Sequence, residues 1–564
     1  MFIRTALLTV AIAAGVSAAP AKFTPMTFQA QDGSKVEAEK GEFTVPENRS
    51  NPNSRTITIR FVRFKSTAAK PGNPIVYLAG GPGGSGVGAA MSTRFPLFMS
   101  FREHADVIAY DQRGINESEP DMRCTEEFMA SPAEPLDRAK GGAAMAAAVR
   151  KCAERLRASG IDLAASNTRE NAADLEDLRK ALGAQKLVLW GISYGTHLAA
   201  ATLRYHPNTV ERVILAGIEG PDDTYKLPSD QQTLMEDIAR LAAQQGRHPD
   251  LLGAINKLLR ELEARPKSVT LTDPRSNQSA TFVFGKLDLQ MYLADMLFAP
   301  DSFAGMADVV GRLEQGDWTA LGLAAAPRRF GNVPSAMSIS MDCASGISAA
   351  RRQRIAEEAK KTLLGDAINM PFPELCAGMQ VPDAGDEFRG PLVSNVPALL
   401  ISGTLDGRTR PRQAEELRMT MPNAQHLVIE NAGHSDPLFL STPKILEAMK
   451  AFLRGEPLRE RYLTAPPAQL LQVRKVATVS EEVLARYAGN YRVDEKTVRK
   501  VIKAGNVLYT LRDGSRPFAI RPSSETEFFY ENTPSTIRFE TKDGKVVAMI
   551  FKGPDGVEQR SVKE

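Results

Sequence analysis

A serine flanked by glycines stands between an apolar stretch and a helix-like stretch of this chain. Ser193 is the centre of a Gly-x-Ser-x-Gly pattern at 191–195, which follows the apolar run 187–190 and precedes the helix-like run 197–203. A strand that turns sharply into a helix lifts a serine oxygen clear of a sheet, and glycines are needed where side chains would collide. We therefore predict that Ser193 is a nucleophile.

The histidines of the chain supply the base that such a serine needs. A serine hydroxyl is a poor nucleophile unless a base takes its proton and a third group orients that base. His434 lies in a loop directly after the last apolar strand-like run, whereas His426 begins that run and is expected at the opposite edge of the sheet. We predict His434 as the base, with His426 as the alternative.

The acid that orients His434 is predicted to be Asp406. Asp406 comes directly after the apolar run 398–402, so both residues follow strands whose carboxyl ends meet at one edge of a parallel sheet. Asp436 is the runner-up, but it stands two residues from His434 and is too close to reach across the imidazole. An ionised Asp406 would fix the tautomer of His434 and stabilise its charged form, although an Asp-Gly turn is the other interpretation.

A glycine-rich loop at 80–86 follows the apolar run 75–78. A tetrahedral intermediate needs backbone N–H donors aimed at the developing oxyanion. Pro82 has no N–H, so Gly81 is the predicted donor from this loop, and Tyr194 beside the serine is the second. A phosphate-cradling loop is the alternative, but neither Gly-Lys-Ser/Thr nor the Gly-x-Gly-x-x-Gly spacing is present.

Short apolar runs alternate with helix-like segments through the first part of the chain and return after residue 393. This alternation predicts a mostly parallel, doubly wound α/β sheet with its chemistry at the carboxyl ends of the strands. Between 221 and 393 the helix-like segments 234–245 and 251–264 replace the strands, which predicts a helical cap inserted at the catalytic edge. The predicted strands are 75–78, 107–110, 187–190, 213–216, 398–402 and 426–429.

The last part of the chain has a different pattern from the rest. Short alternating runs are separated by Asp-Gly pairs at 513–514, 543–544 and 555–556, which are strong hairpin signals. They predict a small antiparallel β domain after a Pro-containing linker. The predicted organisation is a signal peptide at 1–19, an α/β core at 20–220, a helical cap at 221–393, a second core segment at 394–460, a linker at 461–480 and the β domain at 481–564.

Length, composition and the first residues limit the class of protein. With 564 residues, 43% of them hydrophobic, the chain exceeds one ordinary domain. Residues 1–19 combine Arg4 with a short apolar run and small residues, which is typical of a cleaved secretory signal; an uncleaved anchor is the alternative. The net charge of +3, or +2 without Arg4, gives no electrostatic footprint for nucleic acid. We expect export to the periplasm or medium, without stable membrane insertion, and leave the oligomeric state open.

Four cysteines follow the predicted signal peptide. They form no C-x-x-C pair of the kind that binds zinc, and an even number in an oxidising compartment suggests two disulfides. We predict that neighbours pair, Cys124 with Cys152 and Cys343 with Cys376, with free buried thiols as the alternative.

Taken together, these motifs resemble the prolyl aminopeptidase and tripeptidyl aminopeptidase group of α/β-hydrolases, over about residues 40–460. The motifs are the start of the exported branch at 45–49, the glycine loop at 80–86, Asp-Gln-Arg-Gly at 111–114, the turn at 191–196, Asp406 and His434. The resemblance implies an α/β-hydrolase fold with a helical cap, no metal or cofactor, and release of residues or short peptides from a free N-terminus. The tail is similar to small β domains appended to various exported hydrolases.

One departure from the family pattern concerns the substrate. Aminopeptidases must pair the substrate's ammonium group with carboxylates, and related exported hydrolases often carry Glu-Asp shortly after the cap cysteine. Here Cys343 is followed by Ala-Ser-Gly. The alternatives to an exopeptidase are therefore an esterase or amidase for small substrates without a free amine, and a non-catalytic binding protein on the same scaffold. The possible substitute acids, each of which can equally be a helix cap or a solvated charge, are Glu219, Asp222, Asp223 and Asp342.

Overall fold

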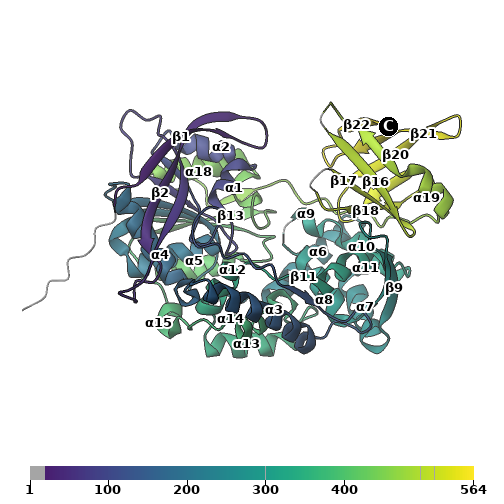
Figure 1. The fold of residues 1–564 in the computed structure, drawn as a ribbon, viewed down its shortest axis with the longest axis horizontal. Helices are drawn as coiled ribbons and strands as arrows, with labels where there is room; N and C mark the ends of the chain where they lie inside the picture. The colour runs from purple at the N-terminus through teal and green to yellow at the C-terminus, as the bar shows by residue number, and fades with distance from the viewer. Residues whose placement is uncertain (1–18, 299, 496, 513–514) are drawn as a thin grey trace, which may run out of the picture.

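The predicted signal peptide, except for Ala19, and the hairpin predicted at 513–514 lie outside the residues that can be described. Within the described residues, no helix is both long enough and apolar enough to cross a membrane. The computed structural model (Figure 1) describes residues 19–298, 300–495, 497–512 and 515–564.

A ten-stranded sheet forms the centre of the molecule, and it is antiparallel at one edge and parallel from β5 onwards. This confirms the prediction of a mostly parallel sheet. Its central strands are continuous apolar runs because both faces of the sheet are covered; all four residues of β4 are buried. The last strand lies in the stretch predicted as a linker, so the sheet continues further along the chain than the sequence indicated. The strand order is β1 (Lys22–Gln29), β2 (Lys35–Pro46), β3 (Thr56–Phe64), β5 (Val107–Tyr110), β4 (Ile75–Leu78), β7 (Leu187–Ser193), β8 (Val210–Ile218), β12 (Ala398–Gly403), β13 (Ala424–Glu430) and β14 (Tyr462–Thr464).

Helices cover the two faces of the sheet and create two separate apolar cores. Alternate residues of β4 enter different cores: Ile75 and Tyr77 enter one, and Val76 and Leu78 enter the other. The first core is covered by α1 (Gly86–Met91), α2 (Phe95–Phe101), α17 (Pro437–Leu440) and α18 (Pro443–Leu453). The second is covered by α3 (Arg138–Ala158), α4 (Thr168–Ala181), α5 (Tyr194–Tyr205) and α16 (Pro411–Arg418).

The chain between β8 and β12 is mainly helical and packs around an apolar core of its own, to which Leu234, Ile255 and Leu293 contribute. We call this segment the cap. Its helices are α6 (Pro228–Gln244), α7 (Leu251–Ala264), α8 (Lys286–Met296), α9 (Pro300–Phe303), α10 (Met306–Glu314), α11 (Thr319–Ala325), α12 (Ala336–Ser345), α13 (Ala349–Ala359), α14 (Glu374–Met379) and α15 (Gly385–Arg389), and its strands are β9 (Lys267–Thr272), β10 (Ser279–Phe284) and β11 (Phe330–Asn332).

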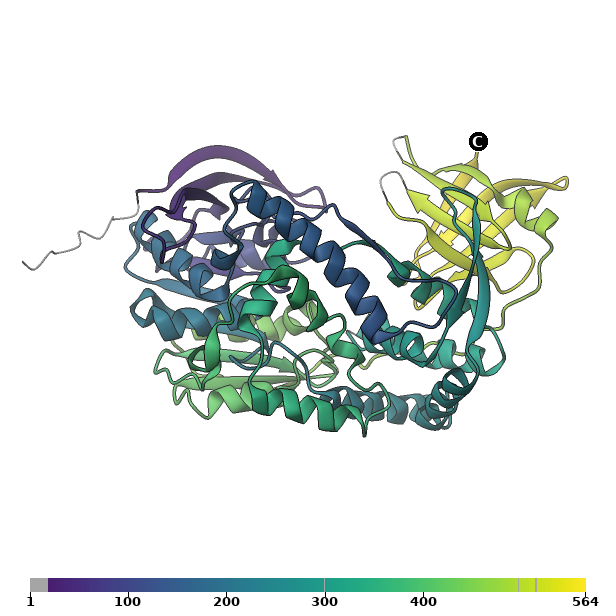
Figure 2. The same cartoon turned by 60° about the horizontal axis from the view of Figure 1, so that its bottom comes forward.

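The cap is joined to an earlier part of the chain. Strand β6 (Glu127–Met129) pairs with β11, and the long helix α3 reaches from the sheet towards the cap (Figure 2). Two disulfides follow the predicted pairing: Cys124 with Cys152, which joins the segment before β6 to α3, and Cys343 with Cys376, which joins α12 to α14. The second disulfide ties together two cap helices, one of which borders the candidate site described below.

The C-terminal β domain is a closed eight-stranded antiparallel barrel with α19 (Glu481–Tyr487) packed against it. The predicted Asp543-Gly544 turn joins β20 to β21, and both of its residues have positive φ (50° and 71°), which suits this dipeptide. The barrel lies beside the cap helices in Figure 1. Its strands are β15 (Gly489–Arg492), β16 (Val498–Ala504), β17 (Val507–Arg512), β18 (Phe518–Pro522), β19 (Glu527–Tyr530), β20 (Thr536–Lys542), β21 (Lys545–Lys552) and β22 (Glu558–Lys563).

A buried ionic cluster joins the cap to the barrel. Asp308 and Arg312, both on α10, are fully buried and lie 3.3 Å apart. Asp308 also forms a 2.6 Å ion pair with Arg474 in the linker, and Arg312 pairs with Glu531 of the barrel. The cluster therefore spans three segments of the chain and fixes the barrel against the cap.

We expect Asp308→Ala to lower the free energy of unfolding by roughly 3 kcal/mol, because it leaves the buried guanidinium of Arg312 without one of its counter-charges. The control is Glu263→Ala, which removes an exposed ion pair to Lys286 and should cost less than about 1 kcal/mol. Urea denaturation followed by tryptophan fluorescence, to which Trp318 of the cap contributes, measures both losses. Equal losses would show that the cluster adds nothing to the docking of the barrel.

Candidate active site

Ser193 occupies a sharp turn at the end of β7 and the start of α5. Its φ and ψ of 54° and −127° are strained for a residue with a side chain. A methyl group at Gly191 would lie 2.8 Å from the Gly195 carbonyl oxygen, and one at Gly195 would lie 2.1 Å from that of Leu78. Both glycines of the motif are therefore required by close backbone packing, and Ser193 remains partly exposed above the sheet.

Asp406 and His434 meet at the same edge of the sheet. Asp406 follows β12 and His434 follows β13; His434 Nδ1 lies 2.8 Å from Asp406 Oδ2, and both side chains are buried. The other carboxylate oxygen accepts hydrogen bonds from the backbone N–H groups of Arg408 (2.7 Å) and Thr409 (2.8 Å). Burial alone would raise the pKa of Asp406, but His434 and these donors outweigh it and lower the pKa. Asp406 is therefore held as a carboxylate that orients the imidazole.

Backbone packing brings His434 towards the end of β7. Ser193 of β7 pairs with Ile218 of β8. Gly217, which precedes Ile218, faces the imidazole of His434. A methyl group at Gly217 would lie 3.0 Å from His434 Cε1, so only glycine leaves room for the ring. Ser193 and His434 form no direct hydrogen bond among the described residues, and hydrogen bonds of this kind are often long before a substrate is bound.

The two alternatives to this base and acid are engaged elsewhere. His426 lies 2.6 Å from Ser402 Oγ through Nε2 and 2.5 Å from Glu415 through Nδ1, so both of its nitrogens have partners. Asp436 pairs with Arg94 at 2.7 Å. These contacts identify structural roles for both residues, and neither contacts Ser193.

The glycine loop between β4 and α1 lies against the serine. A methyl group at Gly80 would approach Ser193 Cβ to 3.0 Å, so the backbone of this loop passes directly beside the turn. Gly81, the predicted donor, is the next residue of this loop. Tyr194 is the first residue of α5, so its N–H has no acceptor within the helix. Its hydroxyl lies 3.0 Å from Thr168 Oγ1.

The Asp-Gln-Arg-Gly motif at 111–114 supports the loop rather than reacting. Asp111 accepts a 2.7 Å hydrogen bond from Ser85, the residue that caps α1, and a 2.8 Å bond from Asn116. Burial raises the pKa of Asp111, although these donors oppose the rise. Arg113 is buried and forms a two-point ion pair with Asp174 of α4. The motif thus fixes the glycine loop and its neighbouring helix in place.

Helix α12 of the cap lies across the glycine loop. Ser338 Cβ would be 3.5 Å from a methyl group at Gly83, so this helix borders the loop that holds Gly81. Asp342 is four residues further on and therefore lies on the same face of the helix, about 6 Å along its axis. The cap helix that borders the site thus carries one of the four acids considered for substrate binding.

Three of the four predicted acids already have partners. Asp222 accepts hydrogen bonds from the Ser348 N–H (2.7 Å) and hydroxyl (2.6 Å) at the start of α13, and Asp223 pairs with Arg351 at 2.7 Å. Both acids therefore contact the cap, Asp222 through neutral donors and Asp223 through a cation. The third, Glu219, is buried and forms a 2.6 Å ion pair with Lys226.

Asp342 is the exception. Within the described chain its carboxylate has no hydrogen bond and no ion pair, although the side chain is only partly exposed. Burial raises the pKa of Asp342 well above its usual range, and the nearby negative charge of Glu219 raises it further, whereas Lys226 and Arg408 oppose the rise. An unpaired, electrostatically stressed carboxylate beside a candidate active site is typical of a functional group.

Three residues near the site were not found from the sequence. Thr409 donates a 2.8 Å hydrogen bond to Asp406 and lies 3.2 Å from His434 Nδ1. Phe298 of the cap packs edge-on against His434, with ring centroids 5.3 Å apart, and the Arg408 guanidinium lies 5.8 Å from the Phe298 centroid. Arg408 and Thr409 follow Asp406 by two and three residues, so their position in the sequence is a local signal that they lie near the site. Phe298 is far from Asp406 in sequence and reaches the site only through tertiary folding.

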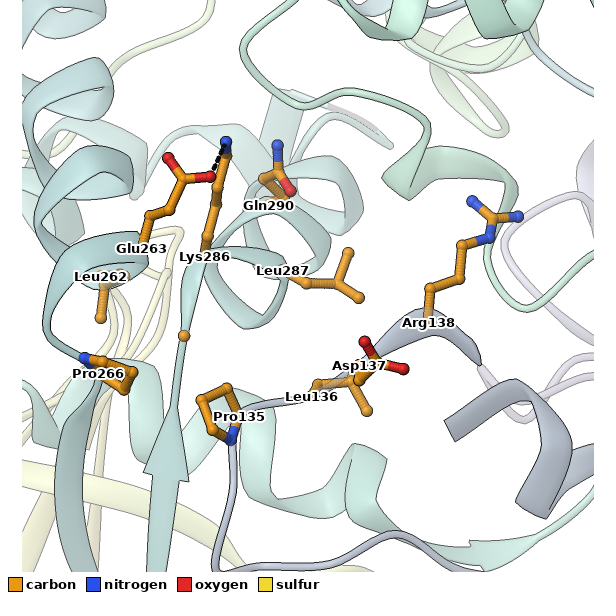
Figure 3. Close-up of a pocket in the computed structure, with 11 residues that line it drawn as sticks. Pro135, Leu136, Asp137, Arg138, Leu262, Glu263, Pro266, Lys286, Leu287 and Gln290 are labelled. Atoms are coloured by element: carbon orange, nitrogen blue, oxygen red, sulfur yellow. Dashed lines mark hydrogen bonds and ion pairs between the residues drawn. The ribbon is translucent and has the colours of Figure 1, made fainter. Parts of the chain in front are cut away.

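A separate pocket of about 410 Å³ opens elsewhere in the cap, where the segment before α3 meets α7 and α8 (Figure 3). Its lining includes Asp137, Leu287 and Gln290, and the exposed Lys286–Glu263 ion pair (2.9 Å) crosses it. It contains neither Ser193 nor any other residue predicted for catalysis. Arg138, which also lines it, pairs with Asp366 and Glu374 outside the pocket, so the candidate site is the sheet edge and not this pocket.

A family model and several known proteins match parts of this chain. A family model described as the alpha/beta hydrolase fold matches residues 73–439. A tripeptidyl aminopeptidase of Streptomyces coelicolor is 27% identical over 311 residues, which cover 51% of this chain and 55% of that protein. The serine protease Hip1 of Mycobacterium tuberculosis is 31% identical over 190 residues, covering 32% and 36%. A probable proline iminopeptidase of S. coelicolor is 34% identical over 64 residues, covering 11% and 20%. The chain spans about half or less of the length of these relatives.

Proposed function

Because this chain belongs to the α/β-hydrolase family, we propose that Ser193, His434 and Asp406 form the catalytic triad of a serine hydrolase. Its relatives include proteins named as an aminopeptidase and a serine protease, so peptide bonds are the proposed target. The proposed reaction releases single residues or short peptides from the free N-terminus of a peptide. The unpaired carboxylate of Asp342 is the observation that carries this choice.

The proposed chemistry proceeds through an acyl-enzyme. Ser193 Oγ attacks the scissile carbonyl carbon while its proton passes to His434 Nε2, and Asp406 stabilises the imidazolium through the 2.8 Å contact to Nδ1. The backbone N–H groups of Gly81 and Tyr194 stabilise the oxyanion. His434 then gives the proton to the leaving amine. Water, activated by the same histidine, hydrolyses the ester and regenerates the serine.

The proposed site for the substrate's ammonium group is Asp342, with Glu219 beside it. Asp223 is neutralised by Arg351, and the carboxylate oxygens of Asp222 accept the Ser348 N–H and hydroxyl, so neither is proposed as the ammonium site. Asp342 has no such partner in the described chain, and Glu219 lies close enough to raise its pKa. Binding of an ammonium group would supply the missing counter-charge, and this gain is available only to substrates with a free amine.

We expect a free-amine peptide arylamide to be cleaved with a kcat/KM at least about 10-fold higher than its N-acetylated form, because acetylation removes the charge that Asp342 pairs with. Asp342→Asn should reduce this preference to near unity, mainly through KM for the free-amine substrate. Asp222→Asn, which alters the contact to Ser348 instead, is the matched control and should keep the preference. Equal turnover of the two substrates by the wild-type protein would refute the exopeptidase assignment.

The preference for a free amine should depend on pH. The raised pKa of Asp342 means that the carboxyl is protonated, and unable to pair with ammonium, over a wider acidic range than usual. The ratio of free-amine to acetylated kcat/KM should therefore increase as pH rises, until the substrate amine itself deprotonates near pH 8. Using the ratio cancels the effects of pH that are common to both substrates. A ratio that is flat with pH would contradict the role of Asp342.

A stability measurement distinguishes loss of binding from misfolding. Because the folded pKa of Asp342 is raised, the folded protein keeps a proton that the unfolded chain loses above about pH 4, and stability falls as pH rises from there. Asp342→Asn removes this penalty, so its Tm at neutral pH should equal or exceed that of the wild type. A variant that is less active and no less stable has lost a functional group.

A second candidate function keeps the triad but changes the substrate. Lys226 neutralises Glu219, which leaves one unpaired carboxylate near the site, and the Glu-Asp pair expected after Cys343 is absent. An esterase or amidase for small substrates without a free amine would need neither acid. Fast hydrolysis of a short-chain aryl ester, together with no preference between free and acetylated peptides, would favour this alternative.

We propose that the protein is exported and works outside the cytoplasm. Both disulfides join segments within the part of the chain that the structure describes, and such bonds persist in oxidising compartments. The signal-like sequence at 1–19 supports the same location. Cell fractionation with antibody detection tests the proposal, and recovery of the protein only in the cytoplasm would refute it.

A further inference from the structure

Three arginines follow the catalytic acid at alternate positions, and they differ in their partners. Arg410 pairs with Asp237 at 3.0 Å, and Arg412 pairs with Asp230 at 2.9 Å. Arg408 has no ion pair anywhere in the described residues, although its side chain is only partly exposed. The arginine without a counter-ion is thus the one nearest Asp406, whose carboxylate accepts its backbone N–H.

The side chain of Arg408 lies on the His434 side of the site. Its guanidinium is 5.8 Å from the centroid of Phe298, and the Phe298 ring is in turn packed edge-on against His434. The histidine is the group that gives a proton to the leaving amine of a cleaved peptide. A charged side chain on this side of the site is therefore placed towards the leaving part of the substrate.

Arg408 and Asp342 are opposite charges that do not neutralise each other. They come from different parts of the chain, the loop after β12 and helix α12, and no ion pair joins them. Asp342 lies on the helix that borders the glycine loop, whereas Arg408 lies on the His434 side of the site. A peptide with its scissile bond at Ser193 can therefore present its amino end to Asp342 and its carboxylate to Arg408, whereas a long chain, at about 3.3–3.6 Å per residue, carries its carboxylate past the site.

We infer that Arg408 binds the C-terminal carboxylate of a short peptide, so that the preferred substrate is a small free peptide held by both of its charged ends. The inference rests on the proposed function, which assigns the ammonium end to Asp342. Arginine suits this role because its planar guanidinium can make two parallel hydrogen bonds to a carboxylate. A C-terminal amide, or a longer chain that carries its carboxylate out of reach, would lose this contact.

The test compares one tripeptide as the free acid and as the C-terminal amide. We expect the wild-type protein to cleave the free acid with a kcat/KM about 10- to 100-fold higher, the size of effect expected for a charge-assisted hydrogen bond. Arg408→Gln should bring the acid-to-amide ratio close to one, and Arg408→Lys should restore part of it because the charge remains without the fork. Arg412→Gln, whose arginine has its own partner, is the matched control and should keep the wild-type ratio.

Two results would overturn the inference: a wild-type ratio near one, or an unchanged ratio in Arg408→Gln. The proposed function is tested separately, with free and acetylated arylamides that have no C-terminal carboxylate. Failure of that test is therefore distinguishable from failure of the acid-to-amide test. Calorimetric titration of the Ser193→Ala protein with the two tripeptides gives a readout without turnover. Tighter binding of the acid than of the amide, lost on combination with Arg408→Gln, supports the assignment, and equal binding contradicts it.

Discussion

Ser193→Ala should lower kcat/KM for a free-amine peptide arylamide by about 10⁴- to 10⁶-fold, because it removes the group that forms the acyl-enzyme. The fold should be unaffected: the strained turn is imposed by Gly191 and Gly195 and by the backbone of β4, which the substitution leaves unchanged. Alanine also removes the site of covalent attack, so labelling by a fluorophosphonate probe should disappear. Initial-rate assays and gel fluorescence measure the two effects.

The control for this prediction is another serine at a structural position. Ser480 caps α19 of the barrel through its hydroxyl, and Ser480→Ala should retain both turnover and labelling. Persistent labelling of the Ser193→Ala protein, with labelling absent after substitution of a different serine, would place the nucleophile elsewhere. Loss of labelling in both variants would instead indicate a folding defect, which thermal denaturation reveals.

His434→Ala should cost about as much activity as loss of the serine, because the members of a triad act as one unit. The neighbouring candidate offers a direct comparison. His426→Ala should leave kcat within about threefold of the wild type, since a residue outside the reacting groups makes no contact with the transition state. It should nevertheless lower the Tm, because the bonds of His426 to Ser402 and Glu415 are lost.

The pair of histidine variants separates catalysis from stability. His434→Ala is expected to be inactive and folded, and His426→Ala active and less stable. The reverse pattern would show that the strand histidine is the base and that the contact between His434 and Asp406 is structural. Steady-state kinetics and thermal unfolding of the same preparations decide between these outcomes.

Much of the sheet and the candidate triad could be predicted because the signals are local. The turn around Ser193 needs two glycines within five residues, and the strand that leads to Asp406 is a short apolar run buried on both faces. The strand that leads to His434 is only partly buried, but it contains the apolar run 427–429. Parallel strands share one carboxyl edge, so residues that follow different strands are brought together. The contact between Asp406 and His434 agrees with this expectation.

The sequence could not predict which of the four acids have partners and which one is left unpaired. Asp222 accepts hydrogen bonds from Ser348, and Asp223 forms an ion pair with Arg351. Both partners are more than 120 residues away along the chain. Asp342 is left unpaired in the described chain because of how α12 crosses the glycine loop. Partners at such separations depend on packing, and no local pattern encodes them.

The sequence by itself predicted the strands of the mostly parallel sheet, the serine turn and the Asp543-Gly544 hairpin, since each depends on residues close together along the chain. The structure also confirmed the predicted neighbour pairing of the cysteines, which their even number alone does not determine. Only the tertiary structure decided that β14 extends the sheet, that Asp308 helps to fix the barrel on the cap, and that Phe298 meets His434. It also left Asp342 and Arg408 without ion-pair partners in the described residues. The physical reason is the range of the interactions: backbone conformation is set by neighbours, whereas the pairing of charges is set by the packing of distant segments.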